Sequence, residues 1–149
     1  MGTEARPRVL YVDDNRDVAD SAGDLLRLVG FEVRVCYDSP TALATAHEFV
    51  PDVCLLDLNI PGMGGDELAV HLREEAGERP VLFVAVTAMG DEESRLRTEA
   101  AGFQLHLVKP VDPHDLLRIL DELTQLLHQI MQRATHTSRP GAEESSSGA

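Results

Sequence analysis

Short apolar runs alternate with longer stretches of helical spacing along almost the whole chain. Each run is four to six residues long and rich in Val and Leu, which is typical of a β-strand buried in a sheet. The stretches between them repeat apolar residues every three or four positions, as amphipathic helices do. The predicted strands are residues 9–12, 33–37, 53–58, 81–86 and 105–108. This alternation predicts an α/β domain with a parallel sheet.

The composition of each run predicts its place in the sheet. Residues 9–12, 53–58 and 81–86 are apolar almost throughout, as expected for strands covered by helices on both faces. Residues 33–37 and 105–108 alternate apolar and polar side chains, which is typical of edge strands. With right-handed crossovers, these positions predict a doubly wound, flavodoxin-like (βα)5 sheet of strand order 2-1-3-4-5. Ligands of such sheets bind at the carboxyl ends of the strands where the order reverses, here the first and the third.

Capping residues mark where the predicted helices begin and end. Ser39 and Asp112 each precede a proline, and a capping side chain followed by proline favours a helix start. Gly30 and Gly102 stand where helices should end, in the left-handed conformation that glycine adopts readily. These signals support five helices, one after each predicted strand.

One domain accounts for the folded part of the chain. The 149 residues match the usual size of a single domain, which we expect to span residues 8–132 after a short extension, residues 1–7. After position 132 the sequence is rich in Gly, Ser and small polar residues and loses its apolar periodicity. Residues 133–149 are therefore predicted to be a disordered tail. We expect no DNA-binding output domain, because the stretch after the last predicted helix is too short to form one.

Charge and composition exclude several classes of partner. Thirteen basic against 26 acidic residues leave a formal charge of −13, which repels nucleic acid phosphates and anionic lipid surfaces. The acidic amino terminus is unlike a signal peptide, and no apolar run is long enough to cross a bilayer. We therefore expect a cytoplasmic protein that binds neither nucleic acid nor membrane. Its two cysteines, Cys36 and Cys54, are expected to be reduced thiols that pack as small apolar groups.

Three carboxylates meet at the predicted ligand edge of the sheet. Asp13 and Asp14 follow the first strand directly, and Asp57 lies at the end of the third. Like charges about 4 Å apart repel by roughly 4 kcal/mol per pair at an effective dielectric constant of 20, so a bound cation is expected. Carboxylate ligands with room for water and phosphate oxygens favour Mg²⁺. In the alternative interpretation, Asp13 and Asp14 cap the first helix and Asp57 is a turn residue.

Two further strand ends add groups that hold phosphoryl oxygens. Thr87 follows the fourth apolar run and offers a hydroxyl, and Lys109 follows the fifth and offers an ammonium. With Mg²⁺ they complete a site at which an aspartate accepts a phosphoryl group and forms an acyl phosphate. The alternative is a strand-end threonine with a backbone partner and a lysine that extends to the surface, but it does not explain why five groups share one edge.

Four segments of the chain resemble the receiver domains of response regulators in two-component phosphorelays. They are VLYVDDN at 9–15, LLDLNIPGMGG at 55–65, VTA at 86–88 and LVKP at 107–110. The likeness covers residues 8 to about 130, nearly the whole predicted domain. The stretch around the last motif is also similar to receivers joined to hybrid sensor kinases, so a stand-alone receiver and a part of a larger protein both fit.

The resemblance gives a role to each acidic residue at the sheet edge. It implies that Asp57 is the phosphoacceptor. It also implies that Asp13, Asp14 and Asp57 bind Mg²⁺ together with the main chain of Asn59. The phosphoryl donor of such domains is a histidine kinase or a phosphotransfer protein.

The remaining matched positions have implied roles in the switch. Thr87 matches the switch hydroxyl, and Lys109 matches the lysine that contacts the phosphate. The peptide bond between Lys109 and Pro110 is expected to be cis, as it usually is in receivers. Gly65 matches the turn that leads into the third helix.

Three further positions are expected to affect the switch or the lifetime of the phosphorylated state. His106 departs from the family, in which an aromatic residue is common three positions before the lysine. Its simplest interpretation is an exposed polar residue on an edge strand, and the alternative is a switch or partner contact. Met89 and Asn59 lie two positions past Thr87 and Asp57, where an attacking water must enter. We expect them to set the lifetime of the phosphorylated state.

The last predicted helix, residues 113–132, carries more apolar side chains than one face needs. The residues expected to face the sheet are Leu116, Leu120, Leu123, Leu127 and Ile130. Ile119 and Leu126 lie off this stripe, which predicts a docking surface for a kinase or target, or a homodimer contact. The alternative is a core face widened by long aliphatic side chains.

The pattern as a whole predicts a signalling switch and not a turnover enzyme. Phosphorylation of Asp57 is expected to shift an equilibrium between two surface conformations that a downstream protein target reads. The alternative is a Mg²⁺-dependent aspartyl-phosphate hydrolase, but such enzymes carry a second acid where this chain has Asn59. A flavin or nucleotide binder fits the fold alone, although no GxGxxG motif follows the first strand.

Overall fold

Strands and helices alternate along the chain as the apolar pattern predicts. The computed structural model describes residues 6–88 and 92–148, and for residues 134–148 it describes the backbone alone. The strands are β1 (Arg8–Val12), β2 (Glu32–Cys36), β3 (Val53–Asp57), β4 (Leu82–Thr87) and β5 (Leu105–Val108). The helices are α1 (Arg16–Leu28), α2 (Ser39–Phe49), α3 (Gly65–Ala76), α4 (Glu92–Ala101) and α5 (Pro113–Gly148).

The five strands form one parallel sheet of order β2-β1-β3-β4-β5, which confirms the predicted topology. Strands β1, β3 and β4 lie inside the sheet because almost all their side chains are apolar and can be covered on both faces. Val12 of β1 lies opposite Leu56 of β3, and Asp57 lies opposite Val86 of β4. This register brings the carboxyl ends of the three central strands to one edge of the sheet.

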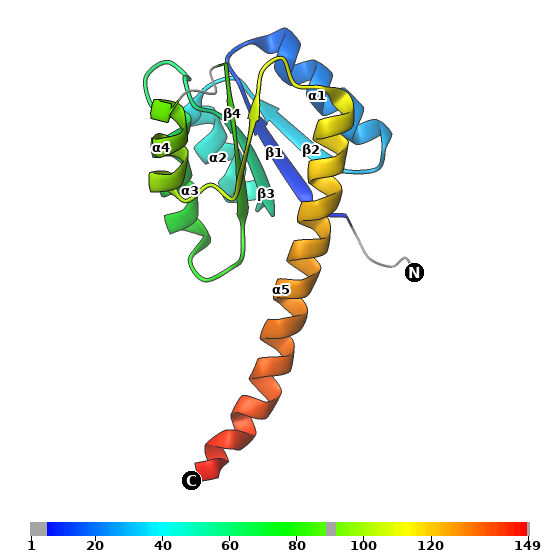
Figure 1. Ribbon diagram of the computed structural model, residues 1–149, viewed down its shortest axis with the longest axis vertical. Coiled ribbons are helices and arrows are strands. Elements are labelled where there is room, and N and C mark those ends of the chain that lie inside the picture. Colours follow the sequence, from blue (N-terminus) through cyan, green and yellow to red (C-terminus); the bar gives the residue numbers. More distant parts are fainter. Residues whose placement is uncertain (1–5, 89–91, 149) are drawn as a thin grey trace.

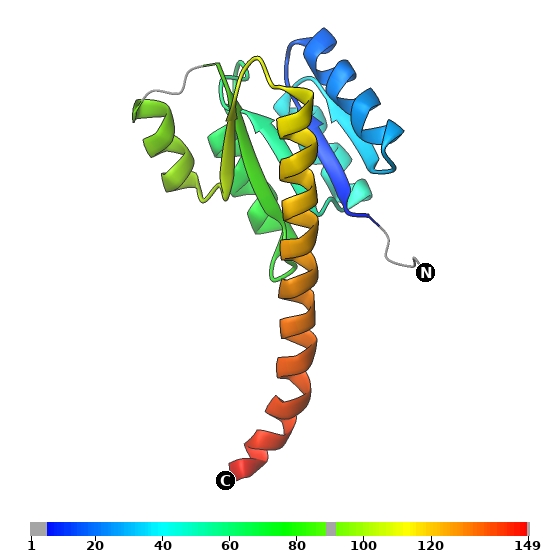
Figure 2. The same cartoon turned by 45° about the vertical axis from the view of Figure 1, so that its right-hand side comes forward.

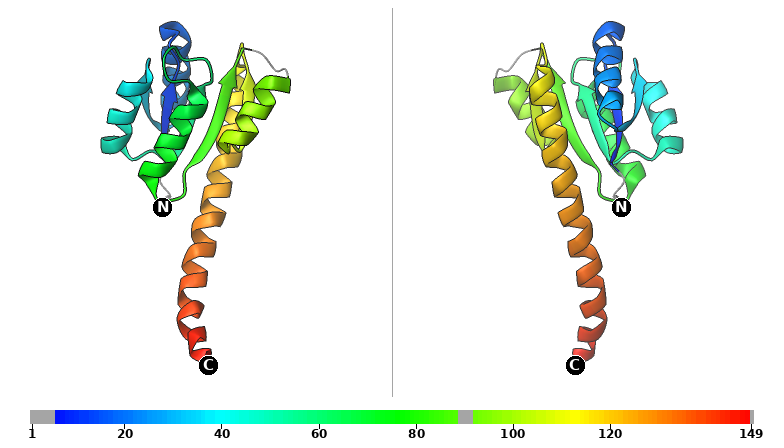
Figure 3. Two further views of the ribbon diagram at one scale, coloured as in Figure 1. Left: turned by 90° about the vertical axis from the view of Figure 1, so that its left-hand side faces the viewer. Right: turned by 90° about the vertical axis from the view of Figure 1, so that its right-hand side faces the viewer.

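Helices cover the sheet on both faces and create two apolar cores. Helices α1 and α5 pack on one face, and α2 and α3 pack on the other (Figure 3). Successive side chains along each central strand point alternately into the two cores, because a strand has a period of two residues. On β1, Val9 and Tyr11 face α1 and α5, whereas Leu10 and Val12 face α2 and α3. Cys36 and Cys54 are free and buried, as predicted.

The predicted strand ends differ from the observed ones by at most one residue. On β2 the predicted strand, residues 33–37, includes Tyr37 as its last residue. Instead β2 ends at Cys36, which is buried. The Tyr37 side chain lies partly at the surface, where its hydroxyl donates a hydrogen bond to Asp20. Tyr37 still packs against the same core as Val33 and Val35, so the alternation of side chains continues one residue past the end of β2.

Helix ends follow the predicted punctuation, with one correction. Gly30 and Gly102 have φ angles of 102° and 82°, which confirms left-handed helix ends. The amino-terminal cap of α2 is Asp38 and not Ser39, because the Asp38 carboxylate accepts a hydrogen bond from the Thr41 backbone N–H. Ser39 lies one residue inside the helix, fully buried, and its hydroxyl donates to the Met63 carbonyl.

Helix α5 is longer than the sequence analysis predicts. It was expected to end near Gln132 with a disordered tail after it, but it continues to Gly148. Figures 1 and 2 show its carboxyl-terminal half extending away from the sheet. The loss of apolar periodicity therefore coincides with the part of the helix that extends away from the sheet. The division of the chain at residues 8 and 132 stays a prediction. No helix in the described ranges is long and apolar enough to cross a membrane.

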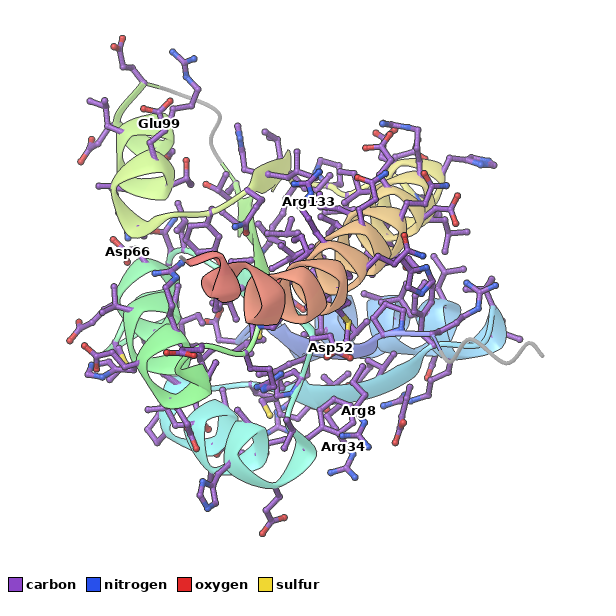
Figure 4. The ribbon with its side chains drawn as sticks, turned by 90° about the horizontal axis from the view of Figure 1, so that it is seen from below. Arg8, Arg34, Asp52, Asp66, Glu99 and Arg133 are labelled. Carbon is purple, nitrogen blue, oxygen red and sulfur yellow. The ribbon has the colours of Figure 1, made fainter. Side chains whose placement is uncertain are left out.

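The amino-terminal edge of the sheet is covered by charged side chains that are already paired. Figure 4 shows this edge from below, with Arg8, Arg34 and Asp52 on it. Both guanidinium groups lie over the ring of Phe49, at 5.7 and 4.8 Å from its centroid. The Asp52 carboxylate accepts a hydrogen bond from the Arg8 backbone N–H at 2.9 Å. The acidic cluster lies at the opposite edge.

Candidate functional site

The sheet topology brings all five predicted groups to the carboxyl edge. Asp13 follows β1 directly and is fully buried, while Asp14 beside it is exposed. Asp57 is the last residue of β3 and Thr87 is the last of β4, and both are buried. Lys109 follows β5 directly.

The Lys109 ammonium lies between two buried carboxylates. Its Nζ is 2.9 Å from Asp13 Oδ2 and 3.1 Å from Asp57 Oδ2. The residues come from β1, β3 and β5, which are far apart in the sequence, so the contact depends on the strand order. One cation thus bridges the two acids that the predicted site requires to be close.

Two loop backbones fix the direction of these carboxylates. The N–H of Asn15 donates to Asp13 Oδ1 at 2.9 Å, and the N–H of Asn59 donates to Asp57 Oδ1 at 3.0 Å. The amino-terminal cap of α1 is Asn15, whose side chain accepts from the Val18 N–H. The interpretation of the acidic pair as a helix cap is therefore wrong, and the acids face the site.

Glycine is required at position 65 because the chain folds tightly back on the end of β3. The Gly65 N–H donates to the Leu58 carbonyl at 3.0 Å. A Cβ atom on Gly65 would lie 2.3 Å from the carbonyl oxygen of Asp57, a backbone atom that cannot move without displacing this residue. The match of Gly65 to a turn thus has a steric cause, which is the close approach of α3 to the end of β3.

Burial and charge act together on the groups of this edge. Burial raises the pKa of the Asp13 carboxyl, and this outweighs the opposing effects of Lys109 and the Asn15 N–H. For Lys109, burial opposes the charged form, but the contacts with Asp13 and Asp57 outweigh it and raise the pKa of the ammonium. Burial, with the nearby carboxylates of Asp13 and Asp57, raises the pKa of Tyr11 far above its usual range. The lysine is therefore charged at neutral pH, and the edge still carries excess negative charge.

The three acids fit a divalent cation. One carboxylate oxygen from each of Asp13, Asp14 and Asp57 lies within 4.8 Å of the others. With Lys109 counted, two negative charges remain in excess, which a divalent ion neutralises. Asp13 is buried, and its Oδ2 shares the single Lys109 ammonium with Asp57. An all-oxygen donor set that is partly open to solvent suits Mg²⁺.

The arrangement is suited to transfer of a phosphoryl group to a carboxylate. Asp57 has a carboxylate whose direction is fixed by the Asn59 N–H, and such an oxygen can act as a nucleophile. Thr87 ends the neighbouring strand β4, and Lys109 follows β5, which is one strand further along the sheet. Their donors can contact the oxygens of a phosphoryl group bound there. Beside Lys109, a mainly apolar groove of about 530 Å³ lies between α1 and the start of α5. Catalysis of this kind needs alignment and charge neutralisation more than proton transfer.

The structure agrees with some of the predictions for the switch positions and differs from others. Met89 lies outside the described residues. His106 is half-buried on β5, opposite Ala85, and not fully exposed as its simplest interpretation requires. Ile119 was predicted to lie off the core face, but it is only 7% exposed and packs in the core under α5, whereas Leu126 is exposed. The apolar face of α5 is broad near the sheet, as the alternative proposed. The peptide bond between Lys109 and Pro110 is cis, as predicted.

Arg97 lies next to the site although no sequence pattern predicts it there. Arg97 of α4 contacts the loop after β3 through the Asn59 side chain and the Leu58 carbonyl. These partners lie 38 and 39 positions away in the sequence, and α4 shows no periodic signal that singles out Arg97. Only the packing of α4 beside α3 brings it to the site.

Comparisons with known proteins agree with this geometry. A family model described as the response regulator receiver domain matches residues 9–121. A solved receiver domain protein (CheY-like) of Methanospirillum hungatei superposes with a TM-score of 0.77 at 28% identity, covering 84% of this chain and 98% of that one. An uncharacterized 14.6 kDa protein of Leptolyngbya boryana is 33% identical over 122 residues, 82% of this chain and 93% of its own.

A longer relative has a regulatory name. The transcriptional regulatory protein PrrA of Mycobacterium tuberculosis is 34% identical over 137 residues, which is 92% of this chain. The chain spans about half the length of this curated relative, 55%. The family model covers most of the chain, and the sheet order and acidic edge agree with it. The chain therefore belongs to the response regulator receiver domain family of two-component signalling proteins.

Proposed function

We propose that this receiver domain accepts a phosphoryl group on Asp57 from a histidine kinase or a phosphotransfer protein. Mg²⁺ would be held by Asp13, Asp14, Asp57 and the main chain of Asn59. The observation that carries this proposal is the position of the Lys109 ammonium, which is 2.9 Å from Asp13 and 3.1 Å from Asp57 at a buried sheet edge. A cation between two buried acids is suited to neutralise a phosphoryl group that arrives on one of them.

The proposed reaction needs no general base from the chain. A carboxylate oxygen of Asp57 forms the new bond to phosphorus, the N–P bond of the donor phosphohistidine breaks, and its electron pair returns to the imidazole nitrogen. Bound Mg²⁺ supplies positive charge to the phosphoryl oxygens. Lys109 keeps its contact with Asp13 and turns its remaining donors to the transferred group. The Thr87 hydroxyl lies on the adjacent strand and is proposed to contact a phosphoryl oxygen, which couples β4 to phosphorylation.

The competing proposal, a Mg²⁺-dependent hydrolase, requires an acid two residues after the nucleophile. This chain has Asn59 there, and its side-chain oxygen accepts a hydrogen bond from Arg97 at 3.2 Å. A carboxamide does not take up or release a proton at neutral pH, so we expect no turnover of p-nitrophenyl phosphate above a protein-free blank. The measurement is p-nitrophenol release with Mg²⁺ at neutral pH. Steady release by the wild-type chain that is lost in Asp57→Asn would favour the hydrolase.

We propose protein partners for this domain, because a formal charge of −13 opposes contact with nucleic acid. PrrA is named a transcriptional regulatory protein, and about half of its length lies outside the match. The predicted lack of a DNA-binding output domain therefore stays a prediction, as does the cytoplasmic location. Both a stand-alone receiver and a receiver within a longer protein agree with the matches.

The surface that phosphorylation switches is proposed to lie on α4, β5 and α5. Exposed large apolar side chains occur on all three elements: Leu96, Val108, Leu126 and Met131. Ile119 is removed from the predicted contact surface because it is buried, and Leu126 is kept. Exposed apolar groups of this kind are typical of contact surfaces.

Replacing Leu96 and Leu126 together with Glu is expected to weaken self-association or kinase binding of the phosphorylated chain about tenfold or more, since charge would replace apolar contact area. Light scattering and a binding titration measure the effect. The matched control is Leu28→Glu on α1, an equally apolar residue that is 82% exposed. Unchanged association and binding in the double variant would place the output surface elsewhere.

A further inference from the structure

Arg97 joins helix α4 to the loop that follows the proposed phosphoacceptor. Its Nε and Nη2 each donate to one carboxylate oxygen of Asp66 at 3.0 Å. Its Nη1 donates to Asn59 Oδ1 at 3.2 Å, and Nη2 also donates to the Leu58 carbonyl at 3.2 Å. One guanidinium group thus holds the first turn of α3 and two consecutive loop residues.

The fork with Asp66 fixes the direction of the guanidinium. A bidentate pair between planar groups leaves little rotational freedom, so the third nitrogen, Nη1, points where the fork directs it. The Arg97 side chain is 34% exposed and that of Asp66 is 29% exposed, which makes this pair more sheltered than an ordinary surface pair. Hydrogen bonding from Arg97 lowers the pKa of Asp66, so the carboxylate stays charged at neutral pH. Figure 4 shows Asp66 where α3 and α4 face each other.

The loop leaves room for this contact. A Cβ atom on Gly64 would lie 2.9 Å from Asp66 Oδ1 and 3.4 Å from Arg97 Nη2. Glycine therefore allows the fork to pack against the loop backbone. Asn59, which this fork reaches, lies two residues past Asp57, and its N–H donates to Asp57 Oδ1.

We propose that Arg97 is a positioning residue that prolongs the phosphorylated state by holding the Asn59 carboxamide away from attacking water. This inference rests on the proposed phosphorylation of Asp57. In hydrolysis, the water oxygen forms a bond to phosphorus, the bond between phosphorus and the Asp57 oxygen breaks, and the electron pair returns to the carboxylate. One proton of the water passes to solvent, and the other stays on the released inorganic phosphate.

The carboxamide matters because the attacking water must be oriented. A water that directs a lone pair at phosphorus needs an acceptor for one of its protons. The Asn59 side chain has a single acceptor atom, Oδ1, and Arg97 donates to that atom. While the contact holds, Oδ1 is turned toward α4. Without it, the carboxamide is free to turn to the water and speed hydrolysis.

The experiment measures decay of the phosphorylated chain with saturating Mg²⁺ after removal of acetyl phosphate. Arg97→Ala is expected to shorten the lifetime about fivefold, the effect of losing one hydrogen bond of ordinary net strength. In an Asn59→Ala background, the same Arg97→Ala change is expected to leave the lifetime unaltered. Arg97→Lys keeps the charge but cannot form the fork, so it is expected to shorten the lifetime as well.

The matched control is Arg95→Ala, which removes the same charge from an exposed position of the same helix. We expect a wild-type lifetime for it. The inference is overturned if Arg97→Ala decays like the wild type, or if Arg97→Ala shortens the lifetime equally in the Asn59→Ala background. It is also overturned if charge alone sets the lifetime. That result would be a shortened lifetime in Arg95→Ala, or a wild-type lifetime in Arg97→Lys. Full labelling with unchanged decay contradicts this inference alone, whereas no labelling of the wild type overturns the proposed function with it.

Discussion

Replacing Asp57 with alanine is expected to reduce labelling of the chain by radioactive acetyl phosphate to background. Asp57 ends β3 and shares the Lys109 ammonium with Asp13, so its removal takes away the proposed nucleophile, which is one of the two carboxylates that this cation contacts at the metal site. Asp13 is not expected to replace it, because the Asp13 side chain is completely buried, whereas part of the Asp57 side chain is open to solvent. Incorporation per chain with Mg²⁺ present measures the effect.

The control for this change is Asp24→Ala, which removes an exposed carboxylate of α1 whose ion-pair partner is Arg27 and not a site residue. It is expected to label like the wild type. Asp57→Ala should remain folded, because the loss of one of two close carboxylates relieves repulsion and leaves Lys109 paired with Asp13. Labelling that persists in folded Asp57→Ala would assign the acceptor to another residue.

Millimolar Mg²⁺ is expected to raise the melting temperature of the wild-type chain by several degrees. Binding at about 100 times the dissociation constant stabilises a folded protein by about 2.7 kcal/mol. The repulsion among Asp13, Asp14 and Asp57, which one lysine only partly offsets, is relieved at the same time. Differential scanning fluorimetry with Mg²⁺ and with chelator measures the shift.

Asp14→Ala is expected to lose most of this shift, because Asp14 is the exposed acid and makes no ion pair with Lys109 that its removal would disturb. The Asp24→Ala variant again serves as the control and should keep the full shift. A wild-type chain whose melting temperature ignores Mg²⁺ would argue against the metal site.

The fold was predictable because the side chains of each strand indicate whether one or both of its faces are buried. Runs that are apolar throughout, such as residues 53–56 of β3, can only lie in the middle of a sheet with helices on both faces. Details that depend on where the backbone turns were harder. Asp38 and Ser39 are both good capping residues, and the choice between them follows from how α2 docks, with Ser39 buried against the Met63 carbonyl.

The central part of the site was predictable for a topological reason. Asp57 and Thr87 each end a parallel strand, and Asp13 and Lys109 each follow one directly, so the strand order alone brings the four residues to one edge. The Arg97 contact has no such rule, because a helix on the outside of the sheet reaches the loop through a long flexible side chain. Ile119 was misplaced because a helix that lies flat on a sheet buries a wider face than a narrow stripe predicts.

The most direct test of the account is to map the phosphoryl group on the wild-type chain. The intact chain is incubated with acetyl phosphate, with and without Mg²⁺, and the modified peptide is identified by mass spectrometry after borohydride reduction. We predict one phosphoryl group per chain, only with Mg²⁺, on the peptide that contains Asp57. Modification at Asp13, Asp14 or another residue, or none at all with Mg²⁺ present, would contradict the account.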